Sequence, residues 1–230
     1  MKETNNQTTL IVAVVAAVAV VAVIGVILLG GGAGPAGAAA FDYSQIPQTR
    51  TEDGAFVLGN PAAPITVVEF ADFTCPHCQD YESTMEDFIR QFVVPGLARF
   101  EYRMVGGTSS PYREYMSAIA ECSDDLKPGS FWDSHDLIFE YARAGRYEEV
   151  VGAIAEQTGV TKAALIECSS TAKQFMTDVN VGAAAGVQGT PAVMIRLNGG
   201  DLSWINIGGQ VLNRGGVPLE ILATVVQSTP

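Results

Sequence analysis

Residues 68–78 read Val-Glu-Phe-Ala-Asp-Phe-Thr-Cys-Pro-His-Cys, and they join a short apolar run to a segment of helical composition. The last four residues of this stretch place two cysteines, Cys75 and Cys78, with two residues between them. Two thiols at this spacing can close a small ring and open it again, which is the chemistry of dithiol–disulfide exchange. The stretch therefore predicts a redox site at a strand-to-helix turn.

The rest of the chain predicts a mixed α/β domain. Short β-branched or alternating runs predict strands over Ile65–Phe70, Arg99–Val105, Ala192–Leu197 and Trp204–Ile207. Helices are predicted over Gln79–Val93, Pro111–Cys122, Phe131–Ala142, Tyr147–Gln157, Lys162–Cys168, Ala172–Ala185 and Pro218–Gln227. Asn198-Gly199 is a typical hairpin turn between the last two strands. This order gives a βαβ unit and a ββα unit separated by a helical insertion.

The N-terminal part predicts a membrane anchor. Residues 10–29 contain no charged side chain and match the thickness of a bilayer. The alternative is a cleaved signal peptide ending near Ala38-Ala39-Ala40, although the apolar run is long for one. Lys2 precedes the span, and no basic residue follows it until Arg50, which predicts a cytoplasmic N-terminus and an extracytoplasmic domain.

The expected organisation follows from these segments. Residues 1–9 form a short cytoplasmic tail, 10–29 the transmembrane anchor, 30–55 a flexible linker and 56–230 the α/β domain, whose helical insertion covers about 108–186. A net charge of −12 excludes nucleic acid as a partner, because polyanions are bound by basic surfaces.

The cysteine pair itself suggests different roles for its two members. Amide groups at a helix start favour the thiolate of Cys75, and His77 would add to this effect. Cys78, one turn inside the helix, is expected to be covered and to act as the resolving thiol. The alternative is a zinc site, but no second CXXC is present. We expect no metal and no cofactor.

Three motifs together give the chain a family resemblance. Residues 68–78 resemble the active-site segment of the DsbA family of thioredoxin-fold oxidoreductases. Residues 186–191, Gly-Val-Gln-Gly-Thr-Pro, resemble the loop that precedes a cis-proline in that family. Residues 129–132 with 135–137 resemble a segment of its inserted helical domain. The likeness runs from about residue 60 to 227 and implies a thioredoxin-like fold with a helical insertion, in a membrane-anchored form.

The resemblance also implies roles for single residues. Cys75 becomes the nucleophile, Cys78 the resolving thiol, and Pro76-His77 the dipeptide typical of oxidising members. Thr190 and a cis Pro191 would bind a substrate strand opposite the cysteines. Glu69 would be the buried acid that exchanges a proton with Cys78.

Several of these assignments have simpler alternatives. Pro191 could begin an edge strand in the trans form. Glu69 could face solvent, which would leave Asp72 as the buried acid. His77 could be a surface residue without a role, and His135 is interpreted as a half-buried helix residue rather than a ligand.

Two further cysteines, Cys122 and Cys168, end different predicted helices of the insertion. In an oxidising compartment two such cysteines usually pair, and they resemble a second pair found in some DsbA-like proteins. We therefore expect a structural disulfide, with two separate buried thiols as the alternative.

The resulting hypothesis is a monomeric, membrane-anchored oxidase that donates a disulfide to exported unfolded or reduced proteins. The resemblance implies reoxidation by a membrane partner of the DsbB or VKOR kind. One rival is an isomerase or reductase on the same fold. Another, of a different class, is a chaperone-like binding module without redox turnover.

Overall fold

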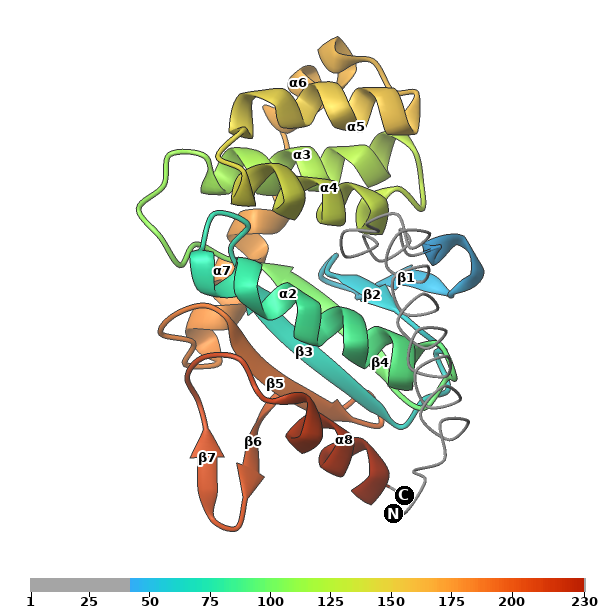
Figure 1. Ribbon diagram of the computed structural model, residues 1–230, viewed down its shortest axis with the longest axis vertical. Helices are drawn as coiled ribbons and strands as arrows, with labels where there is room; N and C mark the ends of the chain where they lie inside the picture. Colours follow the sequence, from blue (N-terminus) through green and yellow to red (C-terminus); the bar gives the residue numbers. More distant parts are fainter. Residues whose placement is uncertain (1–41, 230) are drawn as a thin grey trace, which may run out of the picture. The chain divides into compact units, whose positions relative to one another are not determined.

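A mixed sheet organises the part of the chain described by the computed structural model, residues 42–229. Its strands are β1 (Gln48–Arg50), β2 (Phe56–Leu58), β3 (Ile65–Ala71), β4 (Arg99–Met104), β5 (Ala192–Leu197), β6 (Ser203–Ile207) and β7 (Gln210–Leu212). Their spatial order is β1-β2-β4-β3-β5-β6-β7 (Figure 1). Only β3 and β4 pair in parallel among these strands. β3 is central and buried throughout, Glu69 included, and its β-branched residues predict such a strand.

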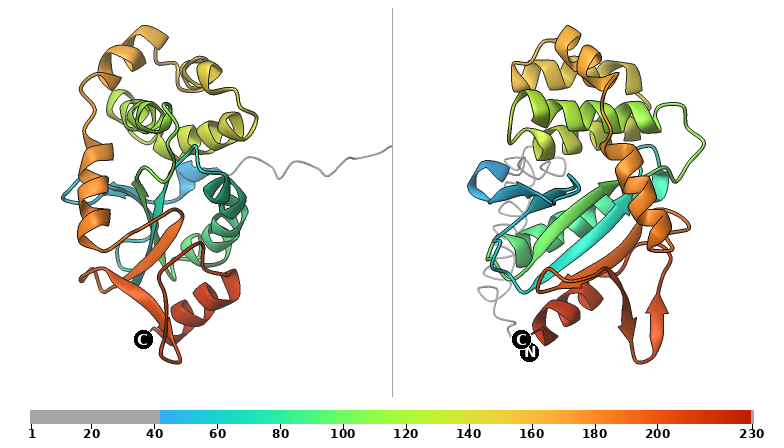
Figure 2. Two further views of the ribbon diagram at one scale, coloured as in Figure 1. Left: turned by 90° about the vertical axis from the view of Figure 1, so that its left-hand side faces the viewer. Right: turned by 180° about the vertical axis from the view of Figure 1, so that it is seen from behind.

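Helices cover both faces of this sheet and form a further layer beyond one of its ends. They are η1 (Tyr43–Gln45), α2 (Pro76–Phe88), η2 (Ile89–Val93), α3 (Arg113–Leu126), α4 (Phe131–Arg143), η3 (Tyr147–Glu149), α5 (Val150–Thr158), α6 (Lys162–Ser169), α7 (Gln174–Ala184) and α8 (Leu219–Ser228). α2 and α8 lie on one face and α7 on the other (Figure 2). α3 to α6 stack as a separate helical layer beyond one end of the sheet. The predicted strands and helices occur in the predicted order, and β1, β2 and β7 are additional strands.

The helical insertion is shorter than predicted. Residues up to the end of α6 belong to the added layer, whereas α7 returns to the sheet. Asp178 of α7 accepts hydrogen bonds from the Arg103 side chain (3.0 Å) and from the backbone amide of Met104 (2.9 Å), both on β4. These contacts make α7 part of the sandwich around the sheet rather than of the insertion.

The predicted flexible linker over 30–55 is wrong for its C-terminal part. Tyr43 is buried, and its hydroxyl donates to Asp136 of α4 (2.9 Å). β1 and β2 then form an antiparallel pair at the edge of the sheet. Strands of three residues are too short to produce a detectable periodicity, so these two escaped the sequence analysis, as did β7.

The predicted membrane span, residues 10–29, lies outside the described residues. Within residues 42–229, no helix has both the length and the apolar character that crossing a bilayer requires. The anchor remains a prediction from the sequence.

A disulfide joins Cys122 of α3 to Cys168 of α6, with their Cα atoms 5.8 Å apart. Its partners are 46 residues apart in the sequence, and a closed loop of this size restricts the unfolded chain. Replacing both cysteines by alanine is expected to lower the free energy of unfolding by about 4 kcal/mol. Urea unfolding of the wild-type and double-variant proteins measures this difference. A loss below about 1 kcal/mol would contradict the prediction.

Candidate active site

Cys75 occupies the turn between β3 and α2. It precedes the first helical residue, Pro76, and its extended backbone (φ −83°, ψ 119°) is typical of a helix N-cap. Proline fits this first position because its missing N–H would have no helical partner there. The N-terminal amides of α2 therefore lie around the sulfur of Cys75, as the sequence analysis expected.

Asp72 holds this turn in place. Its carboxylate accepts hydrogen bonds from the amide and hydroxyl of Thr74 (both 2.8 Å). It also accepts from the amides of Gly107 (2.9 Å) and Thr108 (3.0 Å) and from the Thr108 hydroxyl (3.0 Å). These five hydrogen bonds join the active-site turn to the loop of Gly107 and Thr108, so Asp72 braces the two segments.

The loop before β5 lies against the cysteines. The Thr190–Pro191 peptide bond is cis, and the sulfur of Cys75 lies 3.5 Å from the carbonyl oxygen of Thr190. Gly107 supports this loop from behind, since a Cβ at that position would lie 1.7 Å from the Thr190 hydroxyl oxygen. Cys75 is only 5% exposed, so it is more covered than expected from a position at a turn.

The surroundings of Cys75 favour its thiolate. A hydrogen bond from the Cys78 thiol lowers the pKa of Cys75, burial opposes this, and the Thr190 hydroxyl and the amides of His77 and Cys78 lower it further. The net result is a pKa of about 5. The imidazole of His77 is not among these causes, in contrast to the expectation from the sequence. Cys75 is therefore ionised at neutral pH when it is reduced.

Cys78 has the opposite character. The hydrogen bond to Cys75, burial and the charge of Glu69 raise the pKa of the Cys78 thiol far above its ordinary value. Glu69 is 3% exposed on β3, and burial raises its pKa to about 8. Both Glu69 and Asp72 are thus buried, and the raised pKa of Glu69 suits exchange of a proton with Cys78.

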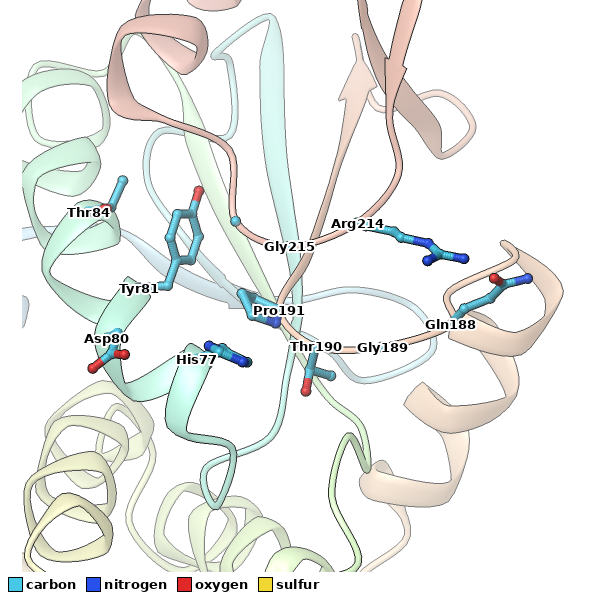
Figure 3. Close-up of a pocket in the computed structure, with 11 residues that line it drawn as sticks. His77, Asp80, Tyr81, Thr84, Gln188, Gly189, Thr190, Pro191, Arg214 and Gly215 are labelled. Atoms are coloured by element: carbon cyan, nitrogen blue, oxygen red, sulfur yellow. The ribbon is translucent and has the colours of Figure 1, made fainter.

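A groove of about 600 Å³ opens beside the active-site turn (Figure 3). His77 is exposed, and it lines the groove opposite Thr190 and Pro191. Arg214 and Asp80 also line it, from opposite walls, so the groove offers both charges to a bound chain. No signal in the sequence marks these two residues, because only the fold brings the segment before α8 next to α2.

Tyr81 fixes the far wall of this groove. Its hydroxyl donates to the carbonyl of Val217 (2.7 Å) and accepts from the amide of the same residue (3.0 Å). Its ring packs so closely on Gly216 that a Cβ there would lie 2.3 Å from it. The groove is therefore held open by packing within the domain.

One group of metal-type ligands lies away from the cysteines. In residues 42–229, Glu82, His135 and Asp136 bring three ligand atoms within 4.8 Å of one another. The imidazole Nδ1 of His135 lies 3.0 Å from Asp136 and 3.8 Å from Glu82. The hydrogen bond between His135 and Asp136 and the ion pair between His135 and Glu82 account for this proximity without a metal ion. His135 itself is fully buried, not half-buried as the sequence suggested.

Comparison with known proteins identifies the family to which this fold belongs. The family described as Thioredoxin matches residues 51–201, more than half of the chain. This chain belongs to the thioredoxin family. The predicted thioredoxin-like α/β fold is thereby confirmed, and the cis Pro191 opposite Cys75 is the arrangement that the family resemblance implied for this thioredoxin-family domain.

Relatives of this thioredoxin-family chain include disulfide bond formation protein D of Bacillus subtilis, which is 29% identical over 153 residues, 62% of this chain and 68% of the relative. Na(+)/H(+) antiporter NhaA 1 of Salinispora arenicola is 32% identical over 101 residues, 44% of this chain, and the match spans only 15% of the antiporter. The crystal structure of alpha-DsbA1 from Wolbachia pipientis shares the fold with a TM-score of 0.61 at 20% identity, covering 78% of this chain and 92% of that one.

Proposed function

We propose that this chain is an extracytoplasmic thiol:disulfide oxidoreductase that donates the Cys75–Cys78 disulfide to exported proteins. The single observation that carries the proposal is the difference between the two thiols. Cys75 has a pKa of about 5, whereas the pKa of Cys78 is far above its ordinary value. A thiol of low pKa is a good leaving group, so a mixed disulfide at Cys75 readily breaks in favour of the substrate.

The proposal has a general part, the enzyme class, and a specific part, the direction of transfer and the substrates. A dithiol:disulfide oxidoreductase agrees with the name of the Bacillus subtilis relative, a disulfide bond formation protein, which matches 62% of this chain. The specific part is ours: we propose that electrons flow from the substrate to the enzyme, that residues 75–78 (Cys-Pro-His-Cys) donate the disulfide, and that the substrates are exported proteins.

The reaction balances in two steps. A substrate thiolate attacks the sulfur of Cys75, and the Cys75–Cys78 bond breaks. Its electron pair leaves on Cys78, which takes a proton from Glu69. A second substrate thiolate then attacks the substrate sulfur of the mixed disulfide, and Cys75 leaves as a stable thiolate. Two electrons pass from substrate to enzyme, and the substrate gains a disulfide.

The groove beside Pro191 supports an extended protein segment as the substrate. The cis Thr190–Pro191 segment lines the groove, where an extended substrate could pair with its backbone, and the charges of Asp80 and Arg214 lie on either side. Anchoring through residues 10–29, reoxidation by a membrane protein of the DsbB or VKOR kind and action as a monomer complete the proposal.

The direction of transfer is tested by the reduction potential of the Cys75–Cys78 pair in glutathione buffers. A donor of disulfides is expected to have a potential above about −180 mV, because the thiolate of Cys75 stabilises the reduced form. The oxidised protein should also oxidise a reduced, unfolded protein stoichiometrically. A potential below about −250 mV would instead indicate a reductase and would overturn the proposal.

The pH dependence of stability provides an independent prediction. The reduced domain is expected to gain stability relative to the oxidised domain as the pH rises from about 5 to about 8. In this window the unfolded chain keeps a proton on Cys75, whose unfolded pKa is about 8.5, while the folded domain does not. The gain is lost as the pH falls through 5. Urea unfolding of both redox forms measures the difference, and a constant difference would contradict it.

A further inference from the structure

A layer of buried titratable groups lies behind Cys78, between the sheet and helices α2 and α4. The groups that face it are Cys78, Glu82 and Glu86 on α2, Glu69 on β3, Tyr102 on β4, His135 and Asp136 on α4, and Tyr43 on η1. Among these groups, His135 is the one basic side chain. The disulfide exchange itself uses only the first part of this layer, Cys78 and Glu69.

The fold brings the two buried carboxyl groups to the same layer. Glu69 and Tyr102 are direct register partners on the parallel strands β3 and β4, so their side chains emerge on the same face of the sheet. Glu82 follows Cys78 by four residues on α2, so it lies one turn further along the same face of the helix. The charge of Glu69 is among the causes that raise the pKa of Glu82.

Two polar atoms in this layer are buried and have no hydrogen-bond partner among the described residues, the hydroxyl of Tyr102 and Nε2 of His135. The two rings are in contact, edge to face, with centroids 4.5 Å apart. Buried polar atoms normally have partners, so their presence beside buried carboxyl groups is unusual for a purely structural core. It is compatible with a path in which protons change position.

The carboxyl groups of Glu69 and Glu82 have similar pKa values. Burial raises the pKa of Glu82 to about 8 although His135 lowers it, and the pKa of Glu69 is also about 8. A proton can therefore pass from one to the other without a large difference in free energy. Burial disfavours the charged form of His135, but Glu82 and Asp136 outweigh it and raise the pKa of His135.

The far end of the layer reaches solvent. The side chain of Glu82 is 12% exposed and that of Asp136 is 33% exposed, whereas His135 between them is 3% exposed. His135 Nδ1 bridges the two carboxylates, at 3.8 Å from Glu82 and 3.0 Å from Asp136. This cluster thus extends from the buried His135 to the surface, and none of its three residues lines the substrate groove.

We propose that Glu82, held by His135 and Asp136, is the outlet through which Glu69 exchanges the proton of Cys78 with solvent. The inference rests on the proposed function. When Cys78 leaves as a thiolate, it takes the proton of Glu69, and Glu82 returns one to Glu69 from solvent. When the pair is reoxidised, Cys78 loses its proton along the same route in reverse. Glu82 acts through Glu69 and is a positioning residue.

The test follows oxidation of the reduced full-length protein by oxidised glutathione in a stopped-flow instrument. The first step forms a mixed disulfide at Cys75, and the second is its displacement by Cys78, which must lose its proton. Glu82→Gln is expected to slow the second step about tenfold at pH 7 in dilute buffer and to leave the first unchanged. Added imidazole, a small proton acceptor, is expected to restore the rate. The reduction potential should not move.

Asp87→Asn is the matched control, because Asp87 is an exposed carboxylate on the same helix, and its second step should equal that of the wild type. His135→Gln, a second variant, should slow the same step. The outlet is overturned if Glu82→Gln behaves like Asp87→Asn, or if its deficit is not restored by imidazole. Failure of the proposed function would instead appear in the wild type, as a lack of disulfide transfer to a reduced protein.

Discussion

Cys75→Ser is expected to lower the rate of disulfide transfer to a reduced, unfolded protein by roughly a thousandfold or more. The variant cannot form the Cys75–Cys78 disulfide, and a serine hydroxyl has neither the low pKa nor the nucleophilicity of the Cys75 thiolate. Recovery of enzymatic activity in reduced ribonuclease, used as a test substrate, measures the transfer.

Cys78→Ser separates the roles of the two cysteines. It also stops turnover with a reduced protein, but it keeps the Cys75 thiolate, which attacks oxidised glutathione and releases one glutathione thiolate, so a Cys75–glutathione mixed disulfide should accumulate because Cys78 is no longer there to displace it. Mass spectrometry under non-reducing conditions detects this adduct. Recovery of ribonuclease activity that is undiminished with Cys75→Ser would indicate that the domain aids folding by binding the unfolded chain, and it would remove the basis of the proposed reaction.

Arg103→Met is expected to lower the free energy of unfolding by about 3–5 kcal/mol. Arg103 is fully buried on β4, and it donates to Glu101 (2.6 Å), to Asp178 of α7 (3.0 Å) and to both oxygens of Asp53 (2.9 and 3.0 Å). Methionine fills much of the volume but leaves two buried carboxylates, Glu101 and Asp178, without this cation. Urea unfolding followed by circular dichroism measures the loss.

Arg50→Met is the control for this prediction. Arg50 forms a 2.7 Å ion pair with Asp125, but both side chains are about a third or more exposed to solvent. Water and salt screen such pairs, so the loss should stay below about 1 kcal/mol. Equal losses in the two variants would show that burial of the Arg103 network adds nothing, and would contradict the argument.

The strands and helices around the redox site could be predicted because their signals are local. β3 is a seven-residue segment rich in β-branched residues, and α2 begins at a proline directly after Cys75. β5 was predicted with its observed bounds, Ala192–Leu197. β1 and β2 could not be predicted in this way. Each has three residues, and they form strands only because β2 pairs with β4 at the sheet edge.

The candidate site divides in the same manner. Residues close together in the sequence, Cys75 and Cys78, could be identified from their spacing alone. Glu69 and Asp72 could not be told apart, because both are acidic residues in one apolar stretch and both prove to be buried. The tertiary structure separates them. Asp72 accepts hydrogen bonds from the amides of Gly107 and Thr108, whereas burial raises the pKa of Glu69.

The sequence by itself determined the pair of thiols, the helix that starts directly after Cys75 and the mixed α/β order, because these depend on neighbouring residues. The tertiary structure alone decided that burial raises the pKa of Glu69, which residues line the groove, and that Glu82 lies beside His135. Those properties arise from burial and from contacts between segments up to more than a hundred residues apart, such as Cys75 with Thr190. Desolvation and charge act through space, and the chain order does not display them.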